Sequence, residues 1–218
     1  PRTQLMTAVR AVFDSWNAEK AVAYRARFGL VGLAGTAVTV QYFRNPIDVA
    51  DSVATITELM DGREFSLGIA RGNRGTPNLV NVVKPVGVLR ETAQSIKRLL
   101  AGDSVQFHDY PTIAEYFNIV PERPFKLQFL PKSPVRTYCG GNGPLALAIG
   151  GACMDGVLFG GTFQSVARAG HMAELMAVVD KAAHEAGRRE QLGRVAEIKL
   201  SVAADGKQAR DFVRRSAG

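Results

Sequence analysis

Residues 65–75 read Phe-Ser-Leu-Gly-Ile-Ala-Arg-Gly-Asn-Arg-Gly, a short apolar strand that runs directly into a glycine-rich turn with two arginines. Glycines leave backbone N–H groups accessible, and a guanidinium can bind a phosphate through two parallel hydrogen bonds. A second turn of this kind, Gly-Gly-Asn-Gly-Pro at 140–144, separates another expected strand from another expected helix. Two such turns at strand ends predict one site for an anionic, nucleotide-like cofactor.

Expected strands and helices alternate along the chain around these two turns. Apolar runs predict strands at residues 29–40, 65–69, 135–139, 156–159 and 195–202. Apolar stripes with helical spacing predict helices at residues 5–28, 45–62, 88–102, 145–154, 166–187 and at the C-terminus. Strands separated by helices of this length imply parallel pairing with right-handed crossovers, in roughly five βα units.

A parallel α/β chain is either doubly wound or a (β/α)₈ barrel, and the turns favour the barrel. No Gly-x-Gly-x-x-Gly follows the first strand, as the usual dinucleotide fingerprint of a doubly wound fold would require. In a barrel, cofactor-binding turns lie at the carboxyl ends of several strands, where both glycine turns lie here. The predicted fold class is α/β, derived from a TIM barrel but incomplete or shortened in this chain, because five units cannot close eight strands.

The alternation of expected strands and helices is interrupted at residues 103–133. This stretch is rich in proline and aromatic residues and shows no clear period. The stretch is too apolar for disorder, so we expect an ordered insertion that covers one end of a single domain spanning residues 1–218. It contains His108, Asp109 and Tyr110. A packed surface loop is favoured over a lid on a substrate pocket for these three residues.

Composition narrows the possible partners. The net charge is +7, but the basic residues are scattered and are not gathered into a stripe with interleaved aromatics, so we expect no nucleic-acid partner. No run of eighteen apolar residues occurs and no secretory signal opens the sequence, so we expect no membrane span. Cys139 and Cys153 lack metal-ligand spacing, as do His171 and His184, so we expect reduced thiols in a cytoplasmic protein and no metal site.

Several short motifs follow one another in one order and spacing. They are Ala-Gly-Thr-Ala-Val-Thr at 34–39, Arg-Asn-Pro at 44–46, Ala-Thr-Ile-Thr-Glu-Leu at 54–59, Leu-Gly-Ile-Ala-Arg-Gly at 67–72, Leu-Arg-Glu at 89–91 and Asp-Gly-Val at 155–157. Together they resemble the bacterial luciferase-like superfamily of flavin-dependent oxidoreductases. Lys-Pro-Val at 84–86 and Tyr-Cys-Gly-Gly-Asn-Gly-Pro at 138–144 are similar to its deazaflavin-dependent branch, typified by methylenetetrahydromethanopterin reductase.

This resemblance implies a barrel-derived fold that binds reduced FMN or a deazaflavin (coenzyme F-420). Such enzymes transfer a hydride or activate oxygen on a small organic substrate. The cofactor-binding residues that the resemblance implies are Ala37, Val38, Arg71, Gly72, Asn73, Gly140, Gly141, Asn142 and Gly143. The peptide bond between the first two matches a non-prolyl cis bond behind the flavin ring. Arg71 is shared with FMN-using luciferases, so the choice of cofactor stays open.

Two alternatives remain open, because the family's short Asp-His-type active-site turn has no counterpart here and no catalytic residue is identified. One is a non-catalytic flavin-binding protein of the same fold. The other is a barrel fragment that serves as a scaffold for a partner. We expect a homodimer, because association would cover an open sheet edge.

Overall fold

The structure is a computed structural model, and it describes residues 38–40, 44–60, 62–70, 83–160, 163–188, 192–197 and 205–216, together with residues 19, 22, 23 and 26. Strands and helices alternate through most of this part of the chain. In chain order they are β1 (Val38–Val40), α3 (Pro46–Glu58), β2 (Phe65–Ala70), α4 (Pro85–Leu100), η1 (Phe107–Asp109), α5 (Pro111–Phe117), β3 (Val135–Gly140), α6 (Pro144–Cys153), β4 (Gly156–Phe159), α7 (Phe163–Arg168), α8 (Met172–Glu185), β5 (Gly193–Ala196) and α9 (Gly206–Ser216).

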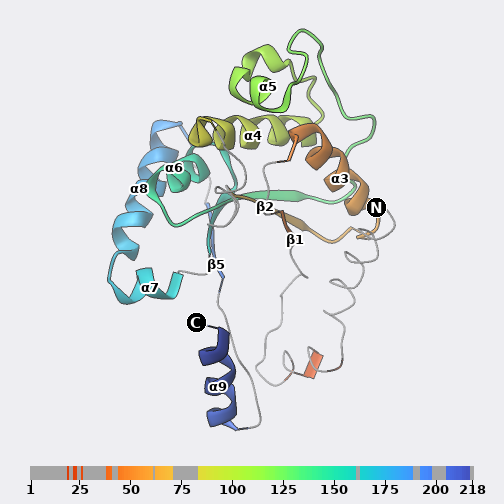
Figure 1. Cartoon of the computed structure of the whole chain (residues 1–218). Coiled ribbons are helices and arrows are strands. Elements are labelled where there is room, and N and C mark those ends of the chain that lie inside the picture. Colours follow the sequence, from red (N-terminus) through yellow and green to blue (C-terminus); the bar gives the residue numbers. More distant parts are fainter. Residues whose placement is uncertain are drawn as a thin grey trace.

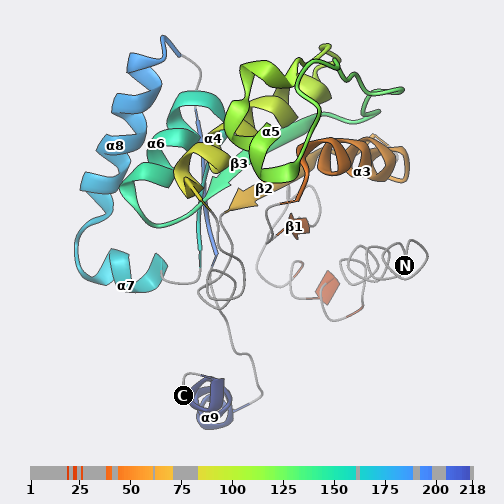
Figure 2. The same cartoon turned by 45° about the horizontal axis from the view of Figure 1, so that its top comes forward.

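The five strands form one parallel sheet in the order β1-β2-β3-β4-β5, so each strand pairs with the next one along the chain. A doubly wound sheet reverses its strand order at the ligand-binding crevice, and this sheet does not. Helices α3, α4, α6 and α8 lie on one side of the sheet (Figures 1 and 2). Sequential parallel strands with helices on one side form the wall of a barrel.

The side chains of β2 point alternately to the two faces of the sheet, and one of these faces packs against the core. Phe65, Leu67 and Ile69 are buried in a cluster with residues of α3, α4 and α6, so the side chains between them point to the opposite face of the sheet. Helix α4 contributes one stripe to this region, because its buried positions recur every three or four residues. A second cluster packs Leu147 of α6 and Val179 of α8 against β4.

Most of the expected strands and helices are confirmed. The start of α3 could be predicted because its capping residues are local in the sequence. Asn45 is the N-cap, and its Oδ1 accepts a hydrogen bond of 3.0 Å from the N–H of Ile47, while Pro46 occupies the first helical position. The expected strand at 156–159 has the predicted bounds, and those at 65–69 and 135–139 each extend one residue further. The expected helix at 5–28 lies almost entirely outside the described residues, and so does most of the strand at 29–40.

The single helix expected at 166–187 is wrong. Two helices, α7 and α8, occupy this stretch, and Gly170 between them has a φ of +78°. A residue in this left-handed conformation ends a helix, and glycine adopts it without steric cost. Strand β5 begins at Gly193, two residues before the predicted start, and the described residues leave out 198–204.

The stretch at 103–133 contains a short helix where the sequence shows no period. Helix α5 has seven residues, too few for a stripe to repeat, and it ends at Asn118 with a φ of +52°. Val105 and Phe125 pair as an isolated antiparallel bridge beside it. The stretch packs on the outer side of α3 and α4, away from the sheet (Figure 1). It therefore adds a third layer over the helices.

Candidate functional site

The turn between β3 and α6 presents an open helix N-terminus. Gly143 is the N-cap, with φ −98° and ψ 150°, and has no side chain that could satisfy the first backbone N–H groups. Pro144 has no N–H to offer, and the first bond of the helix runs from the N–H of Leu147 to the carbonyl of Gly143, at 3.1 Å. The N–H groups of Leu145 and Ala146 therefore have no partner within the helix. With the helix dipole, this geometry suits an anion.

Packing explains two of the glycines in this turn but not the third. A Cβ on Gly140 would lie 2.9 Å from the Cβ of Ala70, and one on Gly141 would lie 2.8 Å from the Cβ of Ala146. Close packing therefore requires both glycines. Among the described residues, a Cβ on Gly143 would meet no atom within 4 Å, and its φ is negative, so their packing does not require this glycine. Its absent side chain leaves space between the α6 N-terminus and the other described residues.

The turn is braced by the end of the neighbouring strand. The N–H of Gly141 donates a 3.0 Å hydrogen bond to the carbonyl of Leu158 in β4. The side-chain amide of Asn142 lies beside Gly160, where an added Cβ would be 3.9 Å from Nδ2. Gly160 was not among the predicted site residues, although the Gly-Gly pair at 160–161 could have indicated a second close approach at this edge.

The structure tests only part of the predicted site. Gly140, Gly141, Asn142 and Gly143 lie together at the carboxyl edge of the sheet, where Ala70 at the end of β2 pairs with Gly140. The backbone of Val38 opens β1 and pairs with Leu67. The remaining predicted contacts fall outside the described residues and stay predictions: Ala37 with its expected cis bond to Val38, Arg71, Gly72 and Asn73.

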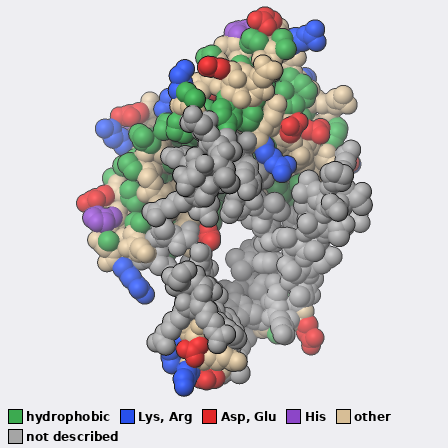
Figure 3. All heavy atoms as spheres, viewed as in Figure 1, with side chains coloured by type: hydrophobic (Ala, Val, Ile, Leu, Met, Phe, Trp, Pro, Cys, Tyr) green, Lys and Arg blue, Asp and Glu red, His purple; other side chains and the backbone are tan. Residues whose placement is uncertain are grey.

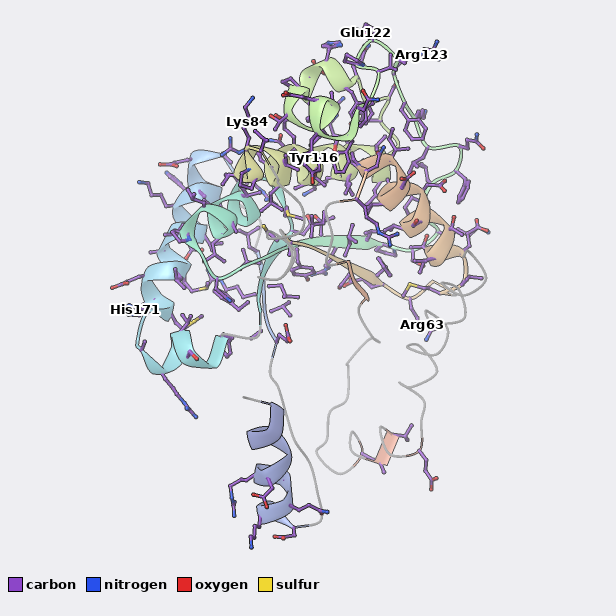
Figure 4. The ribbon with its side chains drawn as sticks, in the orientation of Figure 1. Arg63, Lys84, Tyr116, Glu122, Arg123 and His171 are labelled. Atoms are coloured by element: carbon purple, nitrogen blue, oxygen red, sulfur yellow. The ribbon has the colours of Figure 1, made fainter. Side chains whose placement is uncertain are left out.

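His108 and His171 lie away from this edge. His108 Nε2 lies 3.0 Å from Asp109 Oδ1, with both side chains more than half exposed, and Tyr110 is buried in the layer outside α4. His171 pairs at 3.2 Å with Glu174 at the start of α8, and its label in Figure 4 stands apart from the sheet. Within the described ranges, no three His, Cys, Asp or Glu side chains are grouped as metal ligands would be.

The two cysteines are not poised for chemistry. Cys139 is fully buried, and burial, reinforced by the neighbouring Cys153, raises the pKa of its thiol to about 12. Burial also raises the pKa of Cys153, against the influence of Arg188 and Lys97. Thiols in this state are protonated at neutral pH and are poor nucleophiles.

One face of the molecule shows how the charged side chains of the described residues are distributed. On the face shown in Figure 3, lysine and arginine side chains are interspersed with aspartate and glutamate. None of the helices that the structure describes has the length and apolar character needed to cross a bilayer.

Comparison with known proteins identifies relatives. The family model for luciferase-like monooxygenases matches residues 34–217. The 5,10-methylenetetrahydromethanopterin reductase of Methanolobus tindarius is 29% identical over 126 residues, which are 57% of this chain and 36% of that protein. A separate 41-residue match, 49% identical, links 19% of the chain to 4% of a chloroplastic pyruvate, phosphate dikinase from Mesembryanthemum crystallinum, and this share is too small to indicate a shared fold.

Two solved structures share the fold. An F-420-dependent secondary alcohol dehydrogenase, in complex with an F-420–acetone adduct, superposes with a TM-score of 0.59 at 21% identity, covering 82% of this chain and 52% of its own. The coenzyme F-420-dependent tetrahydromethanopterin reductase of Methanopyrus kandleri superposes with a TM-score of 0.57 at 18% identity, covering 84% and 55%. The chain therefore spans about half the length of these structures. The likeness confirms the expected barrel-derived α/β fold, present here in part.

Proposed function

Because the chain belongs to the luciferase-like monooxygenase family, we propose that it is part of an oxidoreductase that binds coenzyme F-420 and exchanges a hydride between this deazaflavin and a small organic substrate. The relatives named above support the broad class, since they are reductases and a dehydrogenase. The deazaflavin is the finer proposal. It is supported by the two solved structures, both of F-420-dependent enzymes, and by the motifs at 84–86 and 138–144.

The observation that carries the proposal is the open N-terminus of α6 behind Gly143. FMN and coenzyme F-420 both carry a phosphate on the chain attached to their ring. The N–H groups of Leu145 and Ala146 would hold that phosphate, in the space that a side chain at Gly143 would occupy. Charge-assisted hydrogen bonds of this kind contribute about 1.5–3 kcal/mol each, and the helix dipole adds about 0.3–1 kcal/mol.

The bound cofactor would supply the redox chemistry, and the protein would supply its orientation. Small residues line the carboxyl edge beside the turn, with Ala70 against Gly140 and Gly160 against Asn142. Backbone can approach a flat ring closely where Cβ atoms are few.

FMN is the second candidate cofactor, because Arg71 is the residue shared with FMN-using luciferases. Parallel titrations of the purified chain with coenzyme F-420 and with FMN, followed by fluorescence, would separate the two. We expect micromolar binding of F-420 and weaker binding of FMN. Stronger binding of FMN would move the proposal to the other branch, and binding of neither would contradict it.

A non-catalytic flavin-binding protein of the same fold is a second candidate function. Reduction of F-420 by small alcohols, and oxidation of reduced F-420 by ketones or pterins, both followed at the visible absorbance of F-420, distinguish the two. Tight binding without turnover by any substrate would favour the non-catalytic reading.

A further inference from the structure

Helix α5 depends on a carboxylate from another helix. A helix of seven residues is marginal by itself, and its N-cap, Tyr110, makes no side-chain cap bond. Glu91 of α4 takes that role. Its Oε2 accepts a 3.0 Å hydrogen bond from the N–H of Ile113, and its Oε1 accepts one of 2.5 Å from the hydroxyl of Thr112. A carboxylate at this position also complements the positive end of the helix dipole.

Two more contacts join α5 to the same face of α4. A Cβ on Gly87 would lie 3.3 Å from Cγ2 of Thr112, so the backbones approach closely there. Lys84 Nζ lies 3.9 Å from Glu115 Oε2. Positions 84, 87 and 91 recur every three or four residues and therefore form one row along the first turns of α4. Glu91 anchors this row, since the Lys84–Glu115 pair is mostly exposed and contributes little.

The first turn of α4 lies at the edge of the sheet that carries the candidate site. Helix α4 follows β2, whose last residue pairs with Gly140, and α4 packs against α6. Lys84 lies at the end of α4 beside α6 (Figure 4). Lys84 has a φ of +54°, a strained conformation for a residue with a side chain, so it persists only where its surroundings hold it.

Resting on the proposed function, we propose that Glu91 is a positioning residue for the cofactor edge. By docking α5 onto α4, it holds the first turn of α4 in place at the carboxyl end of the sheet. The rest of α4, from Leu89 onward, does not need this support, because Leu89, Ala93 and Ile96 are buried in the core. Loss of the Glu91 carboxylate therefore loosens α5 and the first turn of α4 and leaves the sheet intact.

The experiment combines hydrogen exchange, read by mass spectrometry, with F-420 titration of the whole chain. Glu91→Ala removes the carboxylate, and Glu91→Gln keeps one acceptor oxygen. Thr112→Val removes one donor and serves if the alanine variant does not fold. Asp103→Ala is the matched control, because it breaks the 3.0 Å pair with Arg98 at the opposite end of α4.

We expect Glu91→Ala to speed exchange about tenfold or more in residues 112–118 and in residues 86–88, and to weaken F-420 binding about fivefold or more. Glu91→Gln recovers part of both effects, and Asp103→Ala changes neither. Faster exchange in α5 with unchanged exchange at 86–88, or with unchanged F-420 affinity, would overturn the positioning role. Should the parent chain bind no cofactor, the proposed function fails, while the exchange at 86–88 still decides whether Glu91 holds the first turn of α4.

Discussion

Lys97 Nζ lies 2.8 Å from Asp155 Oδ1, and this ion pair joins α4 to the amino edge of the sheet, opposite the candidate site. The other carboxylate oxygen of Asp155 accepts bonds of 2.8 Å from the N–H and the hydroxyl of Thr137. The carbonyl of Asp155 accepts a 2.9 Å bond from the N–H of Gly193. One residue thus connects α4, β3 and β5 at the edge where barrels are stabilised.

This network predicts acid sensitivity. Burial alone raises the pKa of Asp155, but the hydrogen bonds from Lys97 and Thr137 outweigh it, so the net pKa is lowered below its ordinary value. A carboxyl with a lowered folded pKa stabilises the fold above its unfolded pKa, and this contribution is lost as the pH falls through the folded pKa. We expect Asp155→Asn to lower the free energy of unfolding by about 1.5–3 kcal/mol at pH 7.

Urea unfolding of the parent and Asp155→Asn from pH 7 to pH 3 checks this. The difference between their free energies of unfolding should shrink as the pH falls, because the parent loses the stabilisation by the charged Asp155 carboxylate, which the variant lacks at every pH. A constant difference across that range would show that the charge of Asp155 is not what stabilises the network.

Three paired residues in neighbouring strands leave no room for larger side chains. Tyr138, Gly156 and Gly193 occupy paired positions on β3, β4 and β5. A Cβ on Gly156 would lie 2.1 Å from the carbonyl oxygen of Gly193, and one on Gly193 would lie 2.6 Å from the ring of Tyr138. We expect Gly156→Ala to destabilise the fold by about 1–3 kcal/mol, because backbone must move to admit the methyl group.

Gly143→Ala is the matched control, since no atom of the described residues lies within 4 Å of a Cβ there. Its effect should stay below about 1 kcal/mol, because alanine is a poorer N-cap than glycine but meets no described atom. Chemical denaturation of both variants measures the contrast. Equal stability of Gly156→Ala and the parent would contradict the close approach of β4 and β5.

The thiols should be unreactive while the protein is folded. A pKa of about 12 leaves almost no thiolate on Cys139 at pH 8, and burial protects Cys153 in the same direction. Labelling with a chromogenic disulfide reagent should therefore be slow in buffer and complete in urea. Rapid labelling of either cysteine in buffer would show that the α6–β3 contact opens readily.

Much of the fold could be predicted from the sequence because its signals are local. Asn45 and Pro46 mark the start of α3, and the apolar runs of β2 and β3 are bounded by glycines or prolines. Helix α5 could not be predicted, since its N-terminal cap comes from Glu91, twenty-two residues before Ile113. The break at Gly170 was missed because the apolar spacing continues through it.

The sequence indicated the glycine turn of the candidate site but not the packing of its glycines, and the cofactor contacts stay predictions. Glycine content marked the turn at 140–143, yet nothing in the sequence separates the glycines required by packing from the one that leaves space. That difference depends on Ala70 and Ala146, which approach Gly140 and Gly141 only in the folded sheet. The Tyr138–Gly193 contact was invisible for the same reason, since it depends on the order of three strands.

The central claim, that the N-terminus of α6 holds the phosphate of the cofactor, is tested most directly by F-420 titration of Gly143→Asp beside Gly143→Asn. Both side chains fit the open space and suit an N-cap, so both should preserve or raise the stability of α6. We expect the aspartate to weaken F-420 binding about tenfold or more, since its charge repels the phosphate and competes for the same N–H groups, and the asparagine to weaken it less. Undiminished binding by a folded Gly143→Asp variant would contradict the account.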